Sequence, residues 1–284
     1  MCDTCGCNVT PGNQHLVEPG GKFSHSASGR ESVEVLQNLL SENDHQASHN
    51  RQHFARHQVL AINLMSSPGA GKTSLLEATI KALKGELNIA VIEGDLETEN
   101  DARRIRECGV PAVQITTGSA CHLDAHMVHD ALHQLPLADV DILFIENVGN
   151  LVCPASFDLG QHRNIALLSV PEGDDKPAKY PVMFRSADAV LISKTDLLQV
   201  LPEFSVDRAE ASLRGLASQV PCLSVHTRSS SGIQPWLDWL HGQLGELRDS
   251  RERGDLSNFT SVPEHGHVLM HAHLQQVTPL DDEL

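Results

Sequence analysis

The sequence predicts an α/β protein, with a doubly wound, mostly parallel sheet of about seven strands and helices on both faces. Apolar runs alternate with helix-like segments from residue 59 onward. Several runs, such as Ile-Leu-Phe-Ile at 142–145, are apolar at every position, which is typical of parallel strands buried on both faces. A glycine-containing loop joins the first run to a helix-like stretch, where sheets of this kind carry a phosphate-binding loop.

Hydrophobic periodicity places the elements along the chain. The first is a helix over 31–57, in which Val33, Leu36, Leu39 and Leu40 recur at helical spacing. Apolar runs predict strands near 59–65, 88–93, 111–116, 140–146, 165–170, 187–193 and 220–225. Helices fit the segments near 72–84, 98–107, 122–134, 205–218 and 233–248.

Composition narrows the class of protein and its partners. The 284 residues carry a net charge of −16 without a basic stripe, so nucleic acid and anionic membrane surfaces are not expected partners. The polar N-terminus lacks a signal sequence, and no apolar run approaches the ~18 residues of a membrane span, so we expect a cytoplasmic protein. Seven cysteines, an odd number, and 17 histidines favour metal or thiol chemistry over disulfides.

Residues 66–73, Ser-Ser-Pro-Gly-Ala-Gly-Lys-Thr, match a phosphate-binding loop except at Ser66, where the usual pattern has glycine. Glycines let backbone N–H groups surround phosphate oxygens, and the next helix adds its positive N-terminal dipole. Lys72 is expected to reach the β- and γ-phosphates and Thr73 to ligate Mg²⁺, which makes these two the candidate catalytic residues. A turn without a ligand is the less favoured alternative. The predicted nucleotide-binding residues of the loop are Gly69, Ala70, Gly71, Lys72, Thr73 and Ser74.

A second nucleotide-binding sequence follows a later strand. Residues 193–196, Ser-Lys-Thr-Asp, resemble the guanine-reading Asn-Lys-x-Asp of GTPases, with Ser193 in place of Asn. The Asp196 carboxylate can accept hydrogen bonds from N1–H and the 2-amino group of guanine, whereas adenine would leave it unpaired. The stem of Lys194 can lie along the base. A charged loop at a strand end is the alternative.

Two acidic strand ends are candidates for holding Mg²⁺ beside Thr73. Asp95 ends the second predicted strand and Glu146 the fourth, and ligands of doubly wound sheets gather at these carboxyl ends. The segment from Glu146 to Gly149 also resembles the Asp-x-x-Gly that senses a γ-phosphate, with Glu for Asp. Either acid could instead cap the following helix.

Two groups of residues suggest that the chain binds a soft or borderline metal. Cys2, Cys5 and Cys7 lie within six residues at the N-terminus, and three thiolates with an amine or an outside ligand can satisfy Ni²⁺ or Zn²⁺. Cys121 and His122 are expected to begin a helix, and Cys153 follows soon after Glu146. Taken singly, these three are more typical of packed or satisfied side chains. Together they would place a metal ligand on the segment that moves with nucleotide state.

Histidines recur at helical spacing in two segments, and exposed, solvated helix faces are the favoured interpretation of both. Imidazoles on one face could also ligate metal in pairs. The two sets are His45, His49, His53 and His57, and His122, His126, His129 and His133. A third cluster in the tail could store metal, with His265, His267, His271 and His273. Cys108 and Cys222 are expected to be ordinary buried residues.

These motifs together resemble the hydrogenase nickel-incorporation GTPases, the HypB-type accessory proteins, over residues 1 to about 242. The most specific block is Phe-Ile-Glu-Asn-Val-Gly-Asn-Leu-Val-Cys-Pro at 144–154. The other matching segments are Cys-x-x-Cys-Gly-Cys at 2–7, Asn-Asp…Asn-Arg at 43–51, the phosphate loop, Cys-His-Leu-Asp-Ala at 121–125 and Glu-Gly-Asp at 172–174.

The resemblance implies a P-loop NTPase that hydrolyses GTP while it delivers nickel to the large subunit of [NiFe]-hydrogenase. It further implies a nucleotide-linked homodimer with Cys121, His122 and Cys153 as interface metal ligands, a tighter nickel site at the N-terminal thiols, and a partner zinc/nickel chaperone. Two alternatives remain open: a GTPase serving another nickel or cobalt enzyme such as urease, or a nickel-buffering protein with a regulatory nucleotide site.

The chain is therefore expected to comprise four segments. Residues 1–30 form a flexible metal-binding arm, 31–57 an N-terminal helix, 58–247 a G domain, and 248–284 a polar tail that contains histidines. GTP, Mg²⁺, Ni²⁺ and Zn²⁺ are the expected ligands.

Overall fold

The computed structural model of the chain describes residues 30–95, 99–118, 120–216 and 218–254. Within this part, seven strands form one sheet in the order β3-β2-β4-β1-β5-β6-β7, and every pair is parallel. The strands are β1 (Leu60–Ser66), β2 (Ile89–Asp95), β3 (Ala112–Thr116), β4 (Ile142–Glu146), β5 (Arg163–Ser169), β6 (Ala189–Ser193) and β7 (Cys222–Ser224). The predicted doubly wound α/β sheet is confirmed, and all of its observed strand pairs are parallel.

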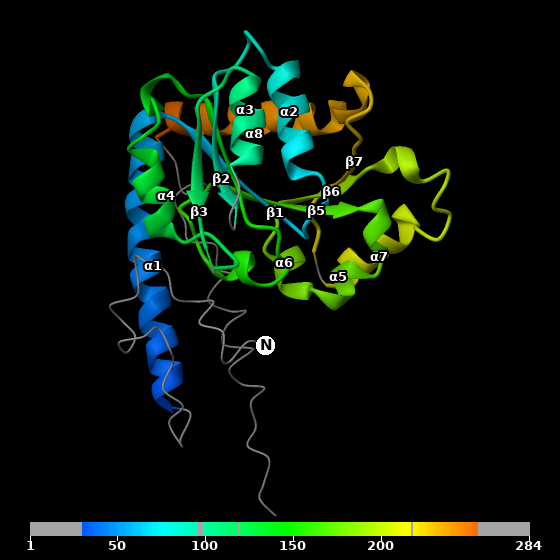
Figure 1. Cartoon of the computed structure of the whole chain (residues 1–284), viewed down its shortest axis with the longest axis horizontal. Coiled ribbons are helices and arrows are strands. Elements are labelled where there is room, and N and C mark those ends of the chain that lie inside the picture. Colours follow the sequence, from blue (N-terminus) through cyan, green and yellow to red (C-terminus); the bar gives the residue numbers. More distant parts are fainter. Residues whose placement is uncertain (1–29, 96–98, 119, 217, 255–284) are drawn as a thin grey trace, which may run out of the picture.

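Helices cover both faces of the sheet (Figure 1). One face packs against α2 (Lys72–Ala82), α3 (Asn100–Glu107) and α8 (Gln234–Glu252), and Trp236 of α8 is completely buried there. The other face packs against α1 (Arg30–His57), α4 (Ala125–Leu132), α6 (Pro181–Arg185) and α7 (Val206–Gly215), beside the short α5 (Lys176–Lys179). No helix of the described segments is long and apolar enough to cross a membrane.

The structure departs from the predicted elements in two places. The predicted helix at 122–134 begins only at Ala125, because Asp124 adopts an extended backbone and its carboxylate caps the helix by accepting from Met127 N at 2.8 Å. Cys121 and His122 therefore lie in the turn before α4 and do not begin the helix. Two short helices, α5 and α6, fill a segment without predicted structure, and each has proline in its first turn.

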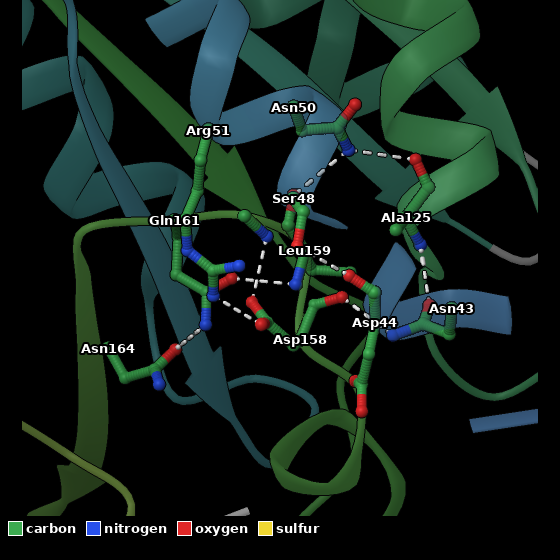
Figure 2. A network of polar contacts seen from close by, with 11 residues as sticks. Asn43, Asp44, Ser48, Asn50, Arg51, Ala125, Asp158, Leu159, Gln161 and Asn164 are labelled. Carbon is green, nitrogen blue, oxygen red and sulfur yellow. Dashed lines mark hydrogen bonds and ion pairs between the residues drawn. The ribbon is translucent and has the colours of Figure 1, made fainter. Parts of the chain in front are cut away.

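Buried polar residues bind α1 to the loops beside the sheet (Figure 2). Asn43 accepts from Ala125 N at 2.9 Å and donates to Asp158 O at 2.8 Å. Asn50 donates to the carbonyls of Ala125 and Leu159 at 2.9 and 3.0 Å, and Arg51 forms an ion pair with the Asp158 carboxylate. Because these groups are buried, loss of one partner leaves an unsatisfied polar atom. The helix is thus packed into the domain along residues 43–54.

Gly160 provides a test of this α1 interface. Its φ is +87°, and a Cβ there would lie 2.6 Å from Ala47 O of α1. We expect Gly160→Ala to lower the free energy of unfolding by roughly 2–5 kcal/mol, from backbone strain plus overpacking. The measurement is urea unfolding followed by circular dichroism. Gly85→Ala is the matched control, because Gly85 has φ +83° with open space around its Cα, and should cost roughly 1–2 kcal/mol. Equal losses of unfolding free energy in the two variants would show that the close approach of α1 adds no cost at Gly160.

Candidate nucleotide and metal site

A cavity of about 420 Å³ opens at the carboxyl ends of β1, β2 and β4. Ligands of doubly wound sheets bind at this edge, where the loops after neighbouring strands meet. Predicted residues that line the cavity are Gly69, Gly71, Lys72, Thr73, Ser74, Asp95, Glu146 and Lys194. Residues that the sequence did not single out also line it, namely Glu93, Asp101, Arg104 and Asn147.

The loop between β1 and α2 has the conformation that its glycines allow. Gly69 and Gly71 adopt φ values of +76° and +101°, which residues with a Cβ rarely adopt. Lys72 is nearly buried, and its Nζ donates to Ser66 Oγ at 3.1 Å. The Ser67 hydroxyl donates to the carboxylate of Glu172, which also accepts from Ser169 N at 2.8 Å. Ser66, the departure from the usual pattern, thus positions the lysine.

Two buried carboxyl groups lie at the base of the cavity. The register of β2 against β4 places Glu93 directly beside Glu146. Thr73 Oγ1 donates to Glu146 Oε1 at 2.8 Å, while Oε2 of each glutamate is buried without a hydrogen-bond partner among the described residues. Burial raises the pKa of both carboxyls, and the charge of Glu146 raises that of Glu93 further. These oxygen atoms beside a hydroxyl are donors that suit a hard divalent cation such as Mg²⁺.

The loop after β6 contacts the phosphate loop directly. Ser193 Oγ donates to Ala70 O at 2.7 Å, and Lys194 Nζ donates to Gly69 O at 2.7 Å. Lys194 adopts φ +57°, which turns the chain sharply after the strand. Asp196 follows in this loop and forms an ion pair with the exposed Arg228, at 3.0 Å from Nε. The serine in place of asparagine therefore still holds the two loops together.

Cys121, His122 and Cys153 converge beside the nucleotide cavity. One ligand atom from each lies within 4.8 Å of the others, and no other group of three or more His, Cys, Asp or Glu in the described segments is as close. The two sulfur atoms are 3.1 Å apart, and Cys121 Sγ is 3.9 Å from His122 Nδ1. Hydrogen bonds from Cys153 and His122 lower the pKa of the Cys121 thiol to about 4. A thiolate, a second thiol and an imidazole are ligands for Ni²⁺ or Zn²⁺.

His122 is fixed in place by its surroundings. Its side chain is completely buried and stacks on Phe157, with ring centroids 3.9 Å apart. Nε2 is buried without a hydrogen-bond partner among the described residues. The alternative of a satisfied surface histidine is therefore wrong, because an unpaired buried imidazole nitrogen is costly unless a ligand occupies it.

Asn147 connects the nucleotide cavity to this group of candidate metal ligands, the Cys121–His122–Cys153 triad. Its Oδ1 accepts from Leu123 N at 3.2 Å and from Val148 N at 3.0 Å, and its Nδ2 donates to Asn63 Oδ1 of β1 at 3.2 Å. A second contact follows at Gly149, where a Cβ would lie 2.8 Å from Pro68 Cα of the phosphate loop. The segment from Glu146 to Cys153 therefore touches both the phosphate loop and the turn that carries His122.

Comparison with known proteins places the chain in a family. A family model described as "CobW/HypB/UreG, nucleotide-binding domain" matches residues 60–224. The hydrogenase maturation factor HypB of Escherichia coli (strain K12) is 49% identical over 223 residues, which are 78% of this chain and 77% of that protein. The chain belongs to the HypB family. The HypB resemblance expected from the motifs is thus confirmed.

Other HypB proteins agree with this assignment. The hydrogenase/urease maturation factor HypB of Helicobacter hepaticus is 46% identical over 79% of this chain and 93% of its own length. HypB from Helicobacter pylori, solved in complex with nickel, superposes with a TM-score of 0.70 at 42% identity, over 72% of this chain and 96% of that one. HypB from Archaeoglobus fulgidus superposes with a TM-score of 0.67 at 37% identity, over 72% and 100%.

Some residues expected from the sequence lie elsewhere or outside the described segments. Cys2, Cys5, Cys7 and the tail histidines at 265–273 are outside them. Cys108 and Cys222 are partly exposed, so neither is an ordinary fully buried residue. Burial and nearby Glu210 still raise the pKa of Cys222 to about 11. Glu93 was missed because its role depends on the strand register. Asn147 lies in the most specific block of the resemblance, but the sequence pattern gave its side chain no role because its partners come from other elements.

The lowered pKa of Cys121 gives a test of the HypB triad. A depressed pKa keeps the thiolate down to pH ~4, so its alkylation by iodoacetamide should change little between pH 8 and pH 6. Alkylation of an ordinary thiol should be roughly 50–100-fold slower at pH 6 than at pH 8, since its thiolate fraction falls as the pH falls. Mass spectrometry of each cysteine peptide measures the rates, with Cys222 as the internal control. A Cys121 rate that follows the ordinary thiol dependence would contradict the thiolate assignment.

Proposed function

We propose that the chain is a GTPase metallochaperone that binds nickel and couples GTP hydrolysis to nickel insertion into the large subunit of [NiFe]-hydrogenase. Nickel is the cargo in this proposal, and zinc is a second ion that the thiols can hold. The observation that carries it is the Asn147 side chain, which links the end of β4 to the turn carrying Cys121 and His122.

The nucleotide part of the proposal rests on the cavity and its loops. Backbone N–H groups at 69–74 and Lys72 would bind the phosphates. Thr73, Asp95 and Glu146 would hold Mg²⁺, which supplies positive charge to the phosphoryl group during hydrolysis. Lys194 and Asp196 would read guanine, and the Ser193 and Lys194 contacts to the phosphate loop support a base-binding loop at that position.

The cargo part rests on the triad and on relatives. Two sulfur ligands and one imidazole suit nickel and zinc far better than magnesium. HypB from Helicobacter pylori was solved in complex with nickel, and relatives bear the name hydrogenase maturation factor. We further propose a homodimer that shares metal ligands of this triad across its interface, a tighter nickel site at Cys2, Cys5 and Cys7, and a zinc/nickel accessory chaperone as partner. A cytoplasmic location fits these partners.

Urease maturation is a second candidate. It is supported by the Helicobacter hepaticus and Helicobacter pylori relatives, each described as a hydrogenase/urease maturation factor. Deletion of the gene distinguishes the two: loss of hydrogenase activity alone, restored by excess nickel, supports the first proposal, and loss of urease activity supports the second.

Coupling between nucleotide and metal is the central prediction. In a Cys2/Cys5/Cys7→Ala variant, Ni²⁺ affinity should differ about 5–150-fold between GDP and a non-hydrolysable GTP analogue, a coupling of ~1–3 kcal/mol. The physical reason is that a γ-phosphate near Glu146 must also shift Asn147 and Cys153. Metal titration followed by thiolate absorbance measures both states. Lys72→Ala should remove the difference, because it removes the positive charge expected to hold the β- and γ-phosphates. Equal affinities in the parent variant would refute the coupling.

The recognition of guanine by Asp196 can be tested by changing the base of the nucleotide. Asp196→Asn should weaken GTP binding by several kcal/mol, roughly 2–5, because the amide cannot accept from both guanine donors. Xanthosine triphosphate, with an acceptor at the 2-position, should bind relatively better. Nucleotide titration gives the GTP/XTP affinity ratio. Arg228→Ala serves as the control, since it removes the ion pair with Asp196 and leaves the carboxylate in place. A ratio that Asp196→Asn leaves unchanged would exclude this role.

A further inference from the structure

A second group of metal-ligating side chains lies between α1 and α4, apart from the triad. His129 and His133 are one turn apart on α4, and their Nε2 atoms are 3.2 Å from each other. His53 of α1 contacts both rings edge to face, with centroids 5.3 and 5.7 Å away. Three imidazoles from two helices thus form one cluster. The favoured interpretation of solvated faces fits the exposed His45, His49 and His133, whereas His53 and His129 are partly buried between the helices.

A buried amide fixes the tautomer of His129. Asn50 is completely buried, and its Nδ2 donates to the carbonyls of Ala125 and Leu159 (Figure 2). This orientation leaves Asn50 Oδ1 as the acceptor for His129 Nδ1, 3.1 Å away. The ring proton of His129 is therefore on Nδ1, and the lone pair of Nε2 points toward His133. Metal-ligating histidines are oriented in the same way, by an outer hydrogen bond from the other ring nitrogen.

The 3.2 Å separation of the two Nε2 atoms also suits a shared cation. Two nitrogens each about 2.0–2.1 Å from a tetrahedral metal are separated by little more than 3 Å. Without a cation, one of the two nitrogens must donate to the other. Burial and the neighbouring histidines lower the pKa of His53 and His129, which favours the neutral imidazoles that bind metals.

We propose that His129 and His133, with His53 turning toward them, form a second metal site, which binds a borderline divalent cation such as Ni²⁺ or Zn²⁺ with water completing the coordination. Before the ion binds, the ligand atoms of these three imidazoles lie farther apart than those of the triad. The site goes beyond the proposed function, because it uses neither the thiols nor the nucleotide loops. Its ligands are all imidazoles and it is half-exposed, so it should hold its ion more weakly than a thiolate site and exchange it with solvent. The bound cation would also cross-link α1 to α4.

The test uses the full chain with the other metal-binding groups removed. The background variant replaces the five cysteines of the thiol sites with serine and the four tail histidines with alanine: Cys2, Cys5, Cys7, Cys121, Cys153, His265, His267, His271 and His273. Co²⁺, Ni²⁺ and Zn²⁺ are titrated by calorimetry, and Co²⁺ also by visible absorption. Thermal unfolding is followed with and without Zn²⁺. His133→Ala, His129→Ala and His53→Ala are compared with His45→Ala, an exposed histidine of α1.

The background variant should bind one equivalent of each metal, give a Co²⁺ spectrum without thiolate charge transfer, and unfold at a higher temperature with Zn²⁺. His133→Ala removes an exposed side chain, so its fold should persist while affinity falls at least ~10-fold and the Zn²⁺-dependent rise in Tm disappears. His129→Ala and His53→Ala should behave alike, and His45→Ala like the background. Failure of the background to bind metal, or equal binding after His133→Ala, would overturn the proposal. Neither result depends on GTP, so failure here leaves the proposed function standing.

Discussion

The buried side-chain amide of Asn147 is the interaction on which both halves of the site depend. It lies at the end of β4, and its hydrogen bonds reach β1 through Asn63 and the turn before α4 through Leu123 N. Because β4 lies between β2 and β1, this one residue lies within reach of the acidic pair, the phosphate loop and the turn that carries Cys121 and His122. An amide suits this position, since it donates and accepts at once and carries no charge to be desolvated. The sheet order makes the two candidate sites neighbours, and the Asn147 amide is hydrogen-bonded to the elements that carry each of them.

The charges in the cavity explain why a nucleotide would need a divalent cation there. Lys72 is the buried cation of the cavity among the described residues, and it lies near two buried carboxyl groups. Without a cation, phosphate oxygens in the cavity would be repelled by these two carboxyl groups when they are ionised. A divalent cation between the carboxyl groups and the phosphates would remove that repulsion. Burial is the main cause of the raised pKa of Glu93, and the neighbouring charge of Glu146 raises it further.

The sequence was sufficient for the features that depend on local patterns. The strand runs and the phosphate loop with its glycines at positive φ follow from residues within one segment. The close approach of Cys121, His122 and Cys153 was expected from the family resemblance, since each residue taken singly suggested a packed or satisfied side chain. Long-range contacts could not be predicted in this way. Glu93 acquires its role from its register with Glu146, His122 is buried by Phe157, and His53 meets His129 only because Asn43, Asn50 and Arg51 bind α1 to the domain. The start of α4 was misplaced for a local reason, since Asp124 was not recognised as its cap.

The direction of α1 determines where the N-terminal cysteines are attached to the domain. α1 ends at His57 and β1 begins at Leu60, so the helix must run antiparallel to that strand. Its first residues consequently point toward the carboxyl edge of the sheet and project beyond it (Figure 1). Arg30, the first residue of the helix, therefore lies on the same side of the molecule as Cys121, His122 and Cys153. The segment that precedes it in the sequence is thus joined to the domain at the edge where the phosphate loop and these three side chains lie.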